Sequence, residues 1–142
     1  MILSPVMKTL LKISLCIGML FLGKAALAQD NSYDVFIPIS KYISQGDADK
    51  LSAWFDDNLE VSVLSSSSNS SRNQARQIMK GFFETYTPRS YDISHKAGRP
   101  NMKYALGTLN AGGETFVVTV FVKYKKEEEG YKVQMIKIER SE

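Results

Sequence analysis

Between residues 31 and 55 the apolar positions of the chain recur at helical spacing. They are Phe36, Ile39, Tyr42, Ile43, Leu51, Trp54 and Phe55. Gly46 divides this stretch in two, because glycine readily adopts the left-handed conformation that ends a helix. Asp47 follows it, with a side chain suited to cap the first turn of another helix. The pattern therefore predicts one helix over 31–45 and a second, shorter helix after Asp47.

The strongest helical pattern covers residues 72–86. Its apolar residues form one continuous stripe: Ala75, Ile78, Met79, Phe82, Phe83 and Tyr86. Ser71 and Gln74 have the spacing of a capping box at the start of this helix. Pro88 ends the helix, because the residue before a proline avoids the helical conformation.

Two short segments precede this long helix. Residues 60–64 alternate between polar and apolar and are rich in residues that favour strands, which predicts a strand. The following run, 65–71, consists of six serines and one asparagine. Because it has no apolar side chain to bury, we expect an exposed, mobile loop there.

After Pro88 the hydrophobic period changes from that of a helix to that of a strand. Four antiparallel strands are predicted there. The first begins near Tyr91, and the other three cover 102–109, 114–126 and 131–140. The strand 114–126 is apolar on both faces, which indicates helices on one side of the sheet and a second subunit on the other. Met135 and Ile136 interrupt the alternation of the last strand and suggest a β-bulge. The order α-α-β-α-β-β-β-β separates the helices from the antiparallel sheet and predicts an α+β fold.

The first 28 residues have the features of a secretory signal peptide. Lys8 and Lys12 precede an uncharged apolar run at 13–22, and a small-residue cleavage pattern ends at Ala28. We expect cleavage between Ala28 and Gln29 and export to the periplasm or out of the cell. A short membrane anchor is the alternative, but the apolar run is shorter than the about 20 residues that span a bilayer.

The chain after the predicted cleavage site, 29–142, has the length of a single domain, and no membrane span is expected in it. The only cysteine, Cys16, precedes it, which excludes disulfides and cysteine-ligated metals. Of the 18 basic residues three precede Gln29, and no acidic residue does, which leaves 15 residues of each sign. A domain without net charge lacks the basic surplus of a nucleic-acid binder, so no nucleic-acid partner is expected.

Three local patterns, together with the element order, are those of a known family. They are Gly46-Asp-Ala-Asp followed by Leu51, Trp54 and Phe55, the stripe of Ile78, Met79, Phe82 and Phe83, and the closing Gly130-Tyr-Lys-Val133 with Ile136 and Ile138. The chain resembles the nuclear transport factor 2-like (cystatin-like cone) superfamily, and within it secreted bacterial domains of unknown function. The resemblance implies a curved antiparallel sheet wrapped around the long helix, often with a pocket at its wide end, and a homodimer through the outer sheet face.

That superfamily includes isomerases, dehydratases and cyclases acting on hydrophobic rings, as well as non-catalytic binding modules. The isomerases need a carboxylate base with a Tyr and a protonated Asp inside the cone, and the dehydratases need a His–Asp pair. The chain has one histidine, His95, which excludes a two-histidine site and, without cysteine or clustered carboxylates, a metal site of the usual kind. Asp56 and Asp57 are expected on solvated surface, so no catalytic residue is assigned.

Three residues are candidates for ligand binding. His95 is expected to share a strand face with Tyr91 and Ile93, and Tyr86 and Tyr104 are expected at the mouth of the cone. We therefore expect an exported, non-catalytic binding or protein-interaction module with a modest apolar pocket. It would take a small apolar ligand or a protein partner and need no cofactor. The alternatives are an isomerase or dehydratase with His95 and Tyr104 in the cone, and a structural dimer whose cone is filled by its own side chains.

Overall fold

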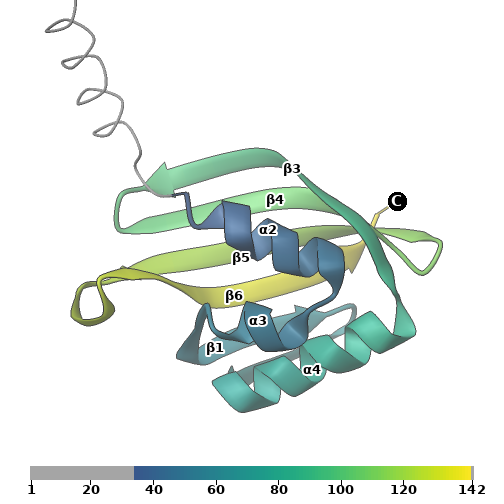
Figure 1. Ribbon diagram of the computed structural model, residues 1–142, viewed down its shortest axis with the longest axis horizontal. Coiled ribbons are helices and arrows are strands. Elements are labelled where there is room, and N and C mark those ends of the chain that lie inside the picture. The colour runs from purple at the N-terminus through teal and green to yellow at the C-terminus, as the bar shows by residue number, and fades with distance from the viewer. Residues whose placement is uncertain (1–33, 142) are drawn as a thin grey trace, which may run out of the picture. The chain divides into compact units, whose positions relative to one another are not determined.

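The computed structural model describes residues 34–141 (Figure 1), so the predicted signal peptide and its cleavage site lie outside the described residues. The helices are α2 (Phe36–Gln45), α3 (Ala48–Ser52) and α4 (Arg72–Thr85). The strands are β1 (Phe55–Val63), β2 (Ser66–Ser71), β3 (Pro88–Arg99), β4 (Met102–Ala111), β5 (Glu114–Lys125) and β6 (Gly130–Arg140). A single turn of 3-10 helix, η1 (Lys126–Glu128), joins β5 to β6.

The strands form one open sheet in the order β2-β1-β6-β5-β4-β3. All neighbouring strands are antiparallel except β1 and β6, which are parallel. Helix α2 packs against β3, and α4 packs against β1 and α3, so the helices cover one face of the sheet (Figure 1). The predicted α+β class is confirmed. Within residues 34–141 no helix is long and apolar enough to cross a membrane.

The hydrophobic core lies between the helices and the sheet. The predicted helical stripes supply Ile39 and Ile43 from α2 and Met79 from α4, each at most 1% exposed. Strands β5 and β6 contribute alternate residues that are equally buried: Phe116, Val118, Val120, Val122, Val133, Ile136 and Ile138. Each large apolar side chain buried in this way stabilises the fold by about 1.5–3 kcal/mol, so the packing of helices on one sheet face is the main source of stability.

The prediction of a mobile loop at 65–71 is wrong. Ser66–Ser71 forms the edge strand β2, which pairs antiparallel with β1 across a turn at Leu64 and Ser65. Leu64 has a positive φ of 57° in that turn. A hairpin is held by backbone hydrogen bonds, which need no apolar side chains, and β1 offers a full row of backbone partners. The element order therefore has one more strand than predicted.

Strand β1 also begins earlier than predicted. Helix α3 ends at Ser52, and Phe55 is the first residue of β1 rather than part of a helical stripe. Phe55 pairs with Val133 of β6 and is fully buried. A tight turn replaces the expected helical continuation, because the Trp54 amide donates to the Leu51 carbonyl at 3.0 Å.

Helix α4 begins with the predicted capping box. The Ser71 hydroxyl accepts a hydrogen bond from the Gln74 amide at 3.2 Å, and the Gln74 side chain accepts one from the Ser71 amide at 3.1 Å. We expect Ser71→Ala to lower the free energy of unfolding by about 1 kcal/mol, because a first-turn amide loses its acceptor. Urea unfolding followed by circular dichroism measures this loss. Ser67→Ala, the same change at an exposed position of β2, should cost less than about 0.5 kcal/mol; equal losses would contradict the capping role.

A β-bulge interrupts β6 one residue before the predicted position at Met135 and Ile136. Consecutive residues of β5 pair with Met135 and Val133, so Gln134 is the extra residue. Toward β1 the same point is also irregular, because residues 56–59 stand opposite Gln134 alone. The bulge therefore opens a gap between β1 and β6 that side chains must fill.

Candidate functional site

The face of the sheet that the helices leave uncovered carries half-buried apolar side chains. The strand register places Tyr104, Phe121 and Met135 in one row across β4, β5 and β6. Leu106 and Val117 lie in the next rows of β4 and β5. Each of these five residues has a fully buried neighbour along its strand, and strand side chains alternate between the two faces. We name these five residues the outer patch.

His95 lies beside the outer patch and not in the core. Ile93 pairs with Gly107, but His95 pairs with Leu106, so Ser94 is an extra residue that reverses the alternation of β3. The expectation that His95 shares a strand face with Tyr91 and Ile93 is therefore wrong, because a simple count of alternating positions does not detect a bulge. His95 is exposed, and its Nε2 atom lies 3.4 Å from the Tyr104 hydroxyl.

Tyr104 connects His95 to the rest of the outer patch. Its ring is stacked on the Phe121 ring, with the centroids 6.2 Å apart and the planes within 3°. The His95 and Tyr104 rings are 5.8 Å apart. The structure thus brings two of the three candidate residues together, on the opposite side of the sheet from the helices.

An apolar hollow of about 350 Å³ borders the outer patch at the β3–β4 turn. It is lined by Gly98, Arg99, Asn101, Met102 and Phe121. Met102 is 39% exposed, which is unusual for a large apolar residue of this chain. Met102 is not among the candidates predicted from the sequence, although the alternation of β4 places it beside a turn and on the same face as Tyr104.

Tyr86, the third candidate, lies away from His95 and Tyr104. It follows α4 as the helix cap, and its ring packs against Phe82 and Phe116 at centroid distances of 5.1 and 5.0 Å. Its hydroxyl accepts a hydrogen bond from Arg140 at 3.0 Å. Gly112 packs against the ring, since a Cβ atom there would lie 3.1 Å from the Tyr86 Cδ1. Tyr86 is therefore only partly exposed and packs against side chains of the protein itself.

Tyr91 is the tyrosine that faces the core. It is 6% exposed, and its hydroxyl donates to the Val118 carbonyl at 2.9 Å. Burial raises the pKa of Tyr91, so the hydroxyl stays protonated. A Cβ atom on Gly107 would lie 2.8 Å from the Tyr91 ring, which explains the glycine in mid-strand. Among residues 34–141 every buried side-chain polar atom has a hydrogen-bond partner.

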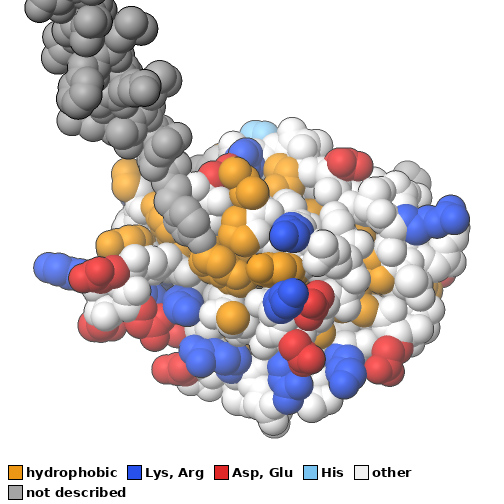
Figure 2. All heavy atoms as spheres, viewed as in Figure 1, with side chains coloured by type: hydrophobic (Ala, Val, Ile, Leu, Met, Phe, Trp, Pro, Cys, Tyr) orange, Lys and Arg blue, Asp and Glu red, His pale blue; other side chains and the backbone are white. Residues whose placement is uncertain are grey.

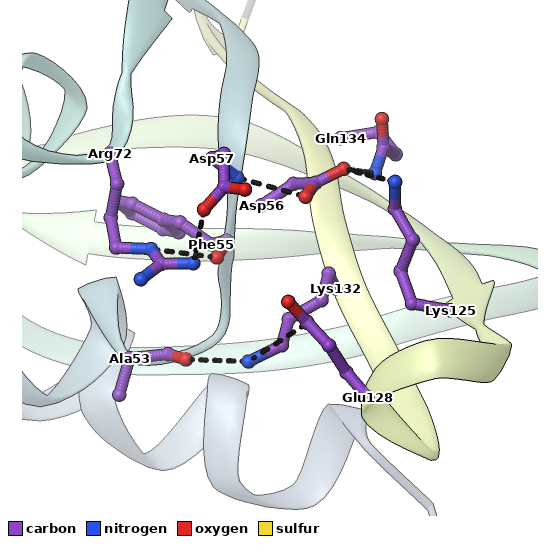
Figure 3. Close-up of polar contacts among 9 residues, drawn as sticks. All are labelled: Ala53, Phe55, Asp56, Asp57, Arg72, Lys125, Glu128, Lys132 and Gln134. Atoms are coloured by element: carbon purple, nitrogen blue, oxygen red, sulfur yellow. Dashed lines mark hydrogen bonds and ion pairs between the residues drawn. The ribbon is translucent and has the colours of Figure 1, made fainter.

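A polar cluster fills the gap that the bulge opens between β1 and β6 (Figure 3). Asp56 is only 8% exposed, which corrects the expectation of solvated surface. One carboxylate oxygen accepts from the Gln134 amide and from Lys125, whose Nζ is 3.0 Å away, and the other accepts from the Asp57 amide at 2.8 Å. Burial by itself would raise the pKa of Asp56, but these hydrogen bonds outweigh it and hold the pKa below its usual value.

Two further cations tie the same region together. The Arg72 guanidinium donates to the Phe55 carbonyl at 3.1 Å and to Asp57 at 3.0 Å. Lys132 donates to the Ala53 carbonyl at 3.1 Å (Figure 3). The hydrogen bonds and ion pairs among these groups join β1, α4 and the β5–β6 hairpin. No three His, Cys, Asp or Glu residues in the described part of the chain are grouped as a metal site would require.

The open sheet with a strongly irregular β1–β6 pairing, and with a long helix and two short ones on one face, is the fold of solved structures described as NTF2-like and cystatin-like. The chain belongs to the family described as Domain of unknown function (DUF4783), whose model matches residues 36–139. None of the curated proteins matches this chain.

Solved structures agree with this assignment. A DUF4783 family protein from Bacteroides uniformis is 18% identical, with a TM-score of 0.72 over 77% of this chain and 99% of that one. A DUF4783 family protein from Bacteroides ovatus is 21% identical, with a TM-score of 0.70 over 74% and 94%. A putative dehydratase from the NTF2-like family of Streptomyces avermitilis is 11% identical, with a TM-score of 0.58 over 75% and 90%. At these identities the likeness extends to the fold alone.

Proposed function

We propose that the protein is an exported, non-catalytic interaction module whose outer patch binds the outer patch of a second copy. The observation that carries this proposal is the outer patch itself, a group of half-buried apolar side chains on a sheet face without helices. An apolar patch with a polar rim is typical of a protein–protein contact. Export rests on the signal-like features of the first 28 residues.

The charges around the outer patch favour a second copy as the partner. Lys137 and Glu139 lie beside it on β6, with their charged groups 3.4 Å apart, and Glu60 and Lys123 lie at its margins. In a two-fold symmetric dimer, the charged residues at the rim of one outer patch face those at the rim of the other. Such a contact needs both signs of charge in the rim, and this rim has them.

The hollow beside the outer patch is the modest apolar pocket of this proposal. Its volume of about 350 Å³ falls at the lower end of the roughly 300–1,000 Å³ of ligand pockets. The partly exposed Met102 offers an adaptable apolar wall for a small ligand. A ligand there would touch Phe121 and so communicate with the dimer contact.

The positions of the titratable groups support a non-catalytic role over the isomerase or dehydratase alternative. Such an enzyme needs a base inside the cone. The single histidine of the chain, His95, is exposed on the outer face. Asp56 is the buried carboxylate of β1, and both of its oxygens are occupied by Gln134, Lys125 and a backbone amide.

Analytical ultracentrifugation of residues 29–142 tests the dimer. We expect a dimer at high micromolar concentration and at least a tenfold weaker association for Phe121→Lys, because a charge would be buried at the centre of the contact. Val117→Lys repeats the test at a second position, and circular dichroism checks that both variants fold. Ile37→Lys is the matched control: Ile37 is 69% exposed on α2, so this variant should still dimerise. A wild-type protein that stays monomeric would overturn the dimer.

Native mass spectrometry of the protein from its own exporting cell tests the other parts of the proposal. A mass that begins at Gln29 is expected from export with cleavage. An additional small-molecule mass, lost in Met102→Lys, is expected from the apolar pocket. An uncleaved chain would contradict export, and a ligand retained equally by both proteins would contradict this location of the pocket.

A further inference from the structure

A second hollow lies between strand β2 and helix α4, on residues separate from the outer patch. Its volume is about 440 Å³, which is within the range of small-ligand sites. The lining residues are Ser68, Asn69, Ser70, Asn73, Gln74, Gln77 and Ile78. All except Ile78 carry a hydroxyl or a carboxamide. The run of serine and amide residues in the sequence is thus folded back on itself to form one surface.

No side chain that lines this hollow is charged, although 23% of the residues of the chain are. Hollows of similar size on the described surface contain Lys80, Arg89 or Arg99. Both arginines of α4 are already paired: Arg72 with Asp57 at 3.0 Å, and Arg76 with Asp49 at 2.9 Å, although Arg76 also donates to the side-chain oxygen of Asn73 at 2.6 Å. Figure 2 shows charged side chains of both signs gathered over the α3 and α4 region, on the helical side of the molecule. Helix α4 therefore separates a charged flank from a neutral one.

The hollow has unused hydrogen-bonding capacity. The Gln77 side chain has no hydrogen-bond partner among the described residues. Asn69 contributes its backbone, because it pairs with Glu60 and its side chain lies on the same face as that of Glu60. Gln74 and Asn73 use only their side-chain oxygens, which accept from the Ser71 amide and from Arg76, so the NH₂ groups of both remain available. The Ser68 and Ser70 hydroxyls lie 3.1 Å apart and hydrogen-bond to each other. The surface thus offers several donors and acceptors within a small area.

We propose that this hollow binds a neutral, hydroxyl-rich ligand, namely the sugar rings of an uncharged oligosaccharide. A charged ligand would find no opposite charge, and an apolar one would remove water from the amides without replacing its hydrogen bonds. A sugar hydroxyl both donates and accepts, which matches the carboxamide and serine groups. Ile78, which is half-buried, supplies an apolar contact for the C–H groups of a ring.

Nuclear magnetic resonance titration of residues 29–142 with the neutral sugars maltohexaose, cellohexaose and hexa-N-acetylchitohexaose tests this proposal. We expect at least one of these sugars to shift the side-chain amide signals of Asn73, Gln74 and Gln77. Gln77→Ala should weaken the binding by about fivefold, the equivalent of one hydrogen bond. Gln45→Ala, an exposed glutamine on α2, is the matched control and should leave the affinity unchanged. These positions are exposed, so the variants are expected to fold.

Three results would overturn the proposal. The first is no shift with any of the three sugars up to about 10 mM, which would mean that binding is too weak for a specific site. The second is an affinity that Gln77→Ala does not change. The third is a preference for an extended peptide that shifts the backbone amides of β2, since an edge strand can also bind a peptide by strand addition. None of these outcomes bears on the dimer, which uses other residues.

Discussion

Replacing Phe116 by alanine is expected to lower the free energy of unfolding by about 4 kcal/mol. Phe116 is fully buried on β5. Its ring contacts Phe82 at 5.3 Å and Tyr86 at 5.0 Å between centroids, and the Arg140 guanidinium lies over it at 5.6 Å. Alanine would leave a cavity at the point where the end of α4 meets the sheet. The side chains around such a cavity move only partly into it.

Phe121→Ala is the matched control for this prediction. The substitution is the same and lies on the same strand, but Phe121 is only half-buried, on the outer face. Its loss should be below about 2 kcal/mol, because less apolar surface returns to water. Chemical unfolding at a protein concentration low enough to avoid association measures both. Equal losses would show that the two faces of β5 are equally packed and would contradict the assignment of an uncovered face.

Asp56→Asn is expected to lower the free energy of unfolding by about 2 kcal/mol at neutral pH, because the donors around the site lose a charged acceptor in a poorly solvated place. Asn keeps the shape of the side chain, so packing is preserved. Asp57→Asn is the control in the next position. The Asp57 side chain is 78% exposed and pairs with Arg72 at the surface, so its loss should be below about 0.5 kcal/mol.

The contribution of Asp56 also has a defined pH dependence. Its pKa in the folded protein lies below the ordinary value of 3.8, so the unfolded chain takes up the proton first as the pH falls. The stabilisation is therefore fully present above about pH 4 and is lost as the pH falls through the folded-state pKa. Unfolding curves between neutral pH and about pH 2 should converge for the wild type and Asp56→Asn. Parallel curves would refute the role of the charge.

The polar cluster and the outer face contain Asp56 and His95, two residues whose positions the sequence predicted wrongly. Asp56 was expected on solvated surface, because two adjacent aspartates after a short helix are usually hydrated. Its burial depends on Gln134, a residue 78 positions later that the bulge of β6 directs toward it. His95 changed sides because of a single extra residue, Ser94, in β3. The composition of each strand changes too little at its bulge for the hydrophobic pattern alone to locate the extra residue.

The sequence by itself determined helix α4 and its capping box, the junction of α2 and α3 at Gly46 and Asp47, and the approximate extents of β4, β5 and β6. These features depend on periodicity and on hydrogen bonds between residues a few positions apart, so local sequence carries them. Only the tertiary structure decided that the serine run is a strand, that His95 and Tyr104 meet outside the core, and that Asp56 is buried. Those outcomes depend on the pairing of strands distant in the sequence, where backbone partners and one-residue shifts in register set the position of each side chain.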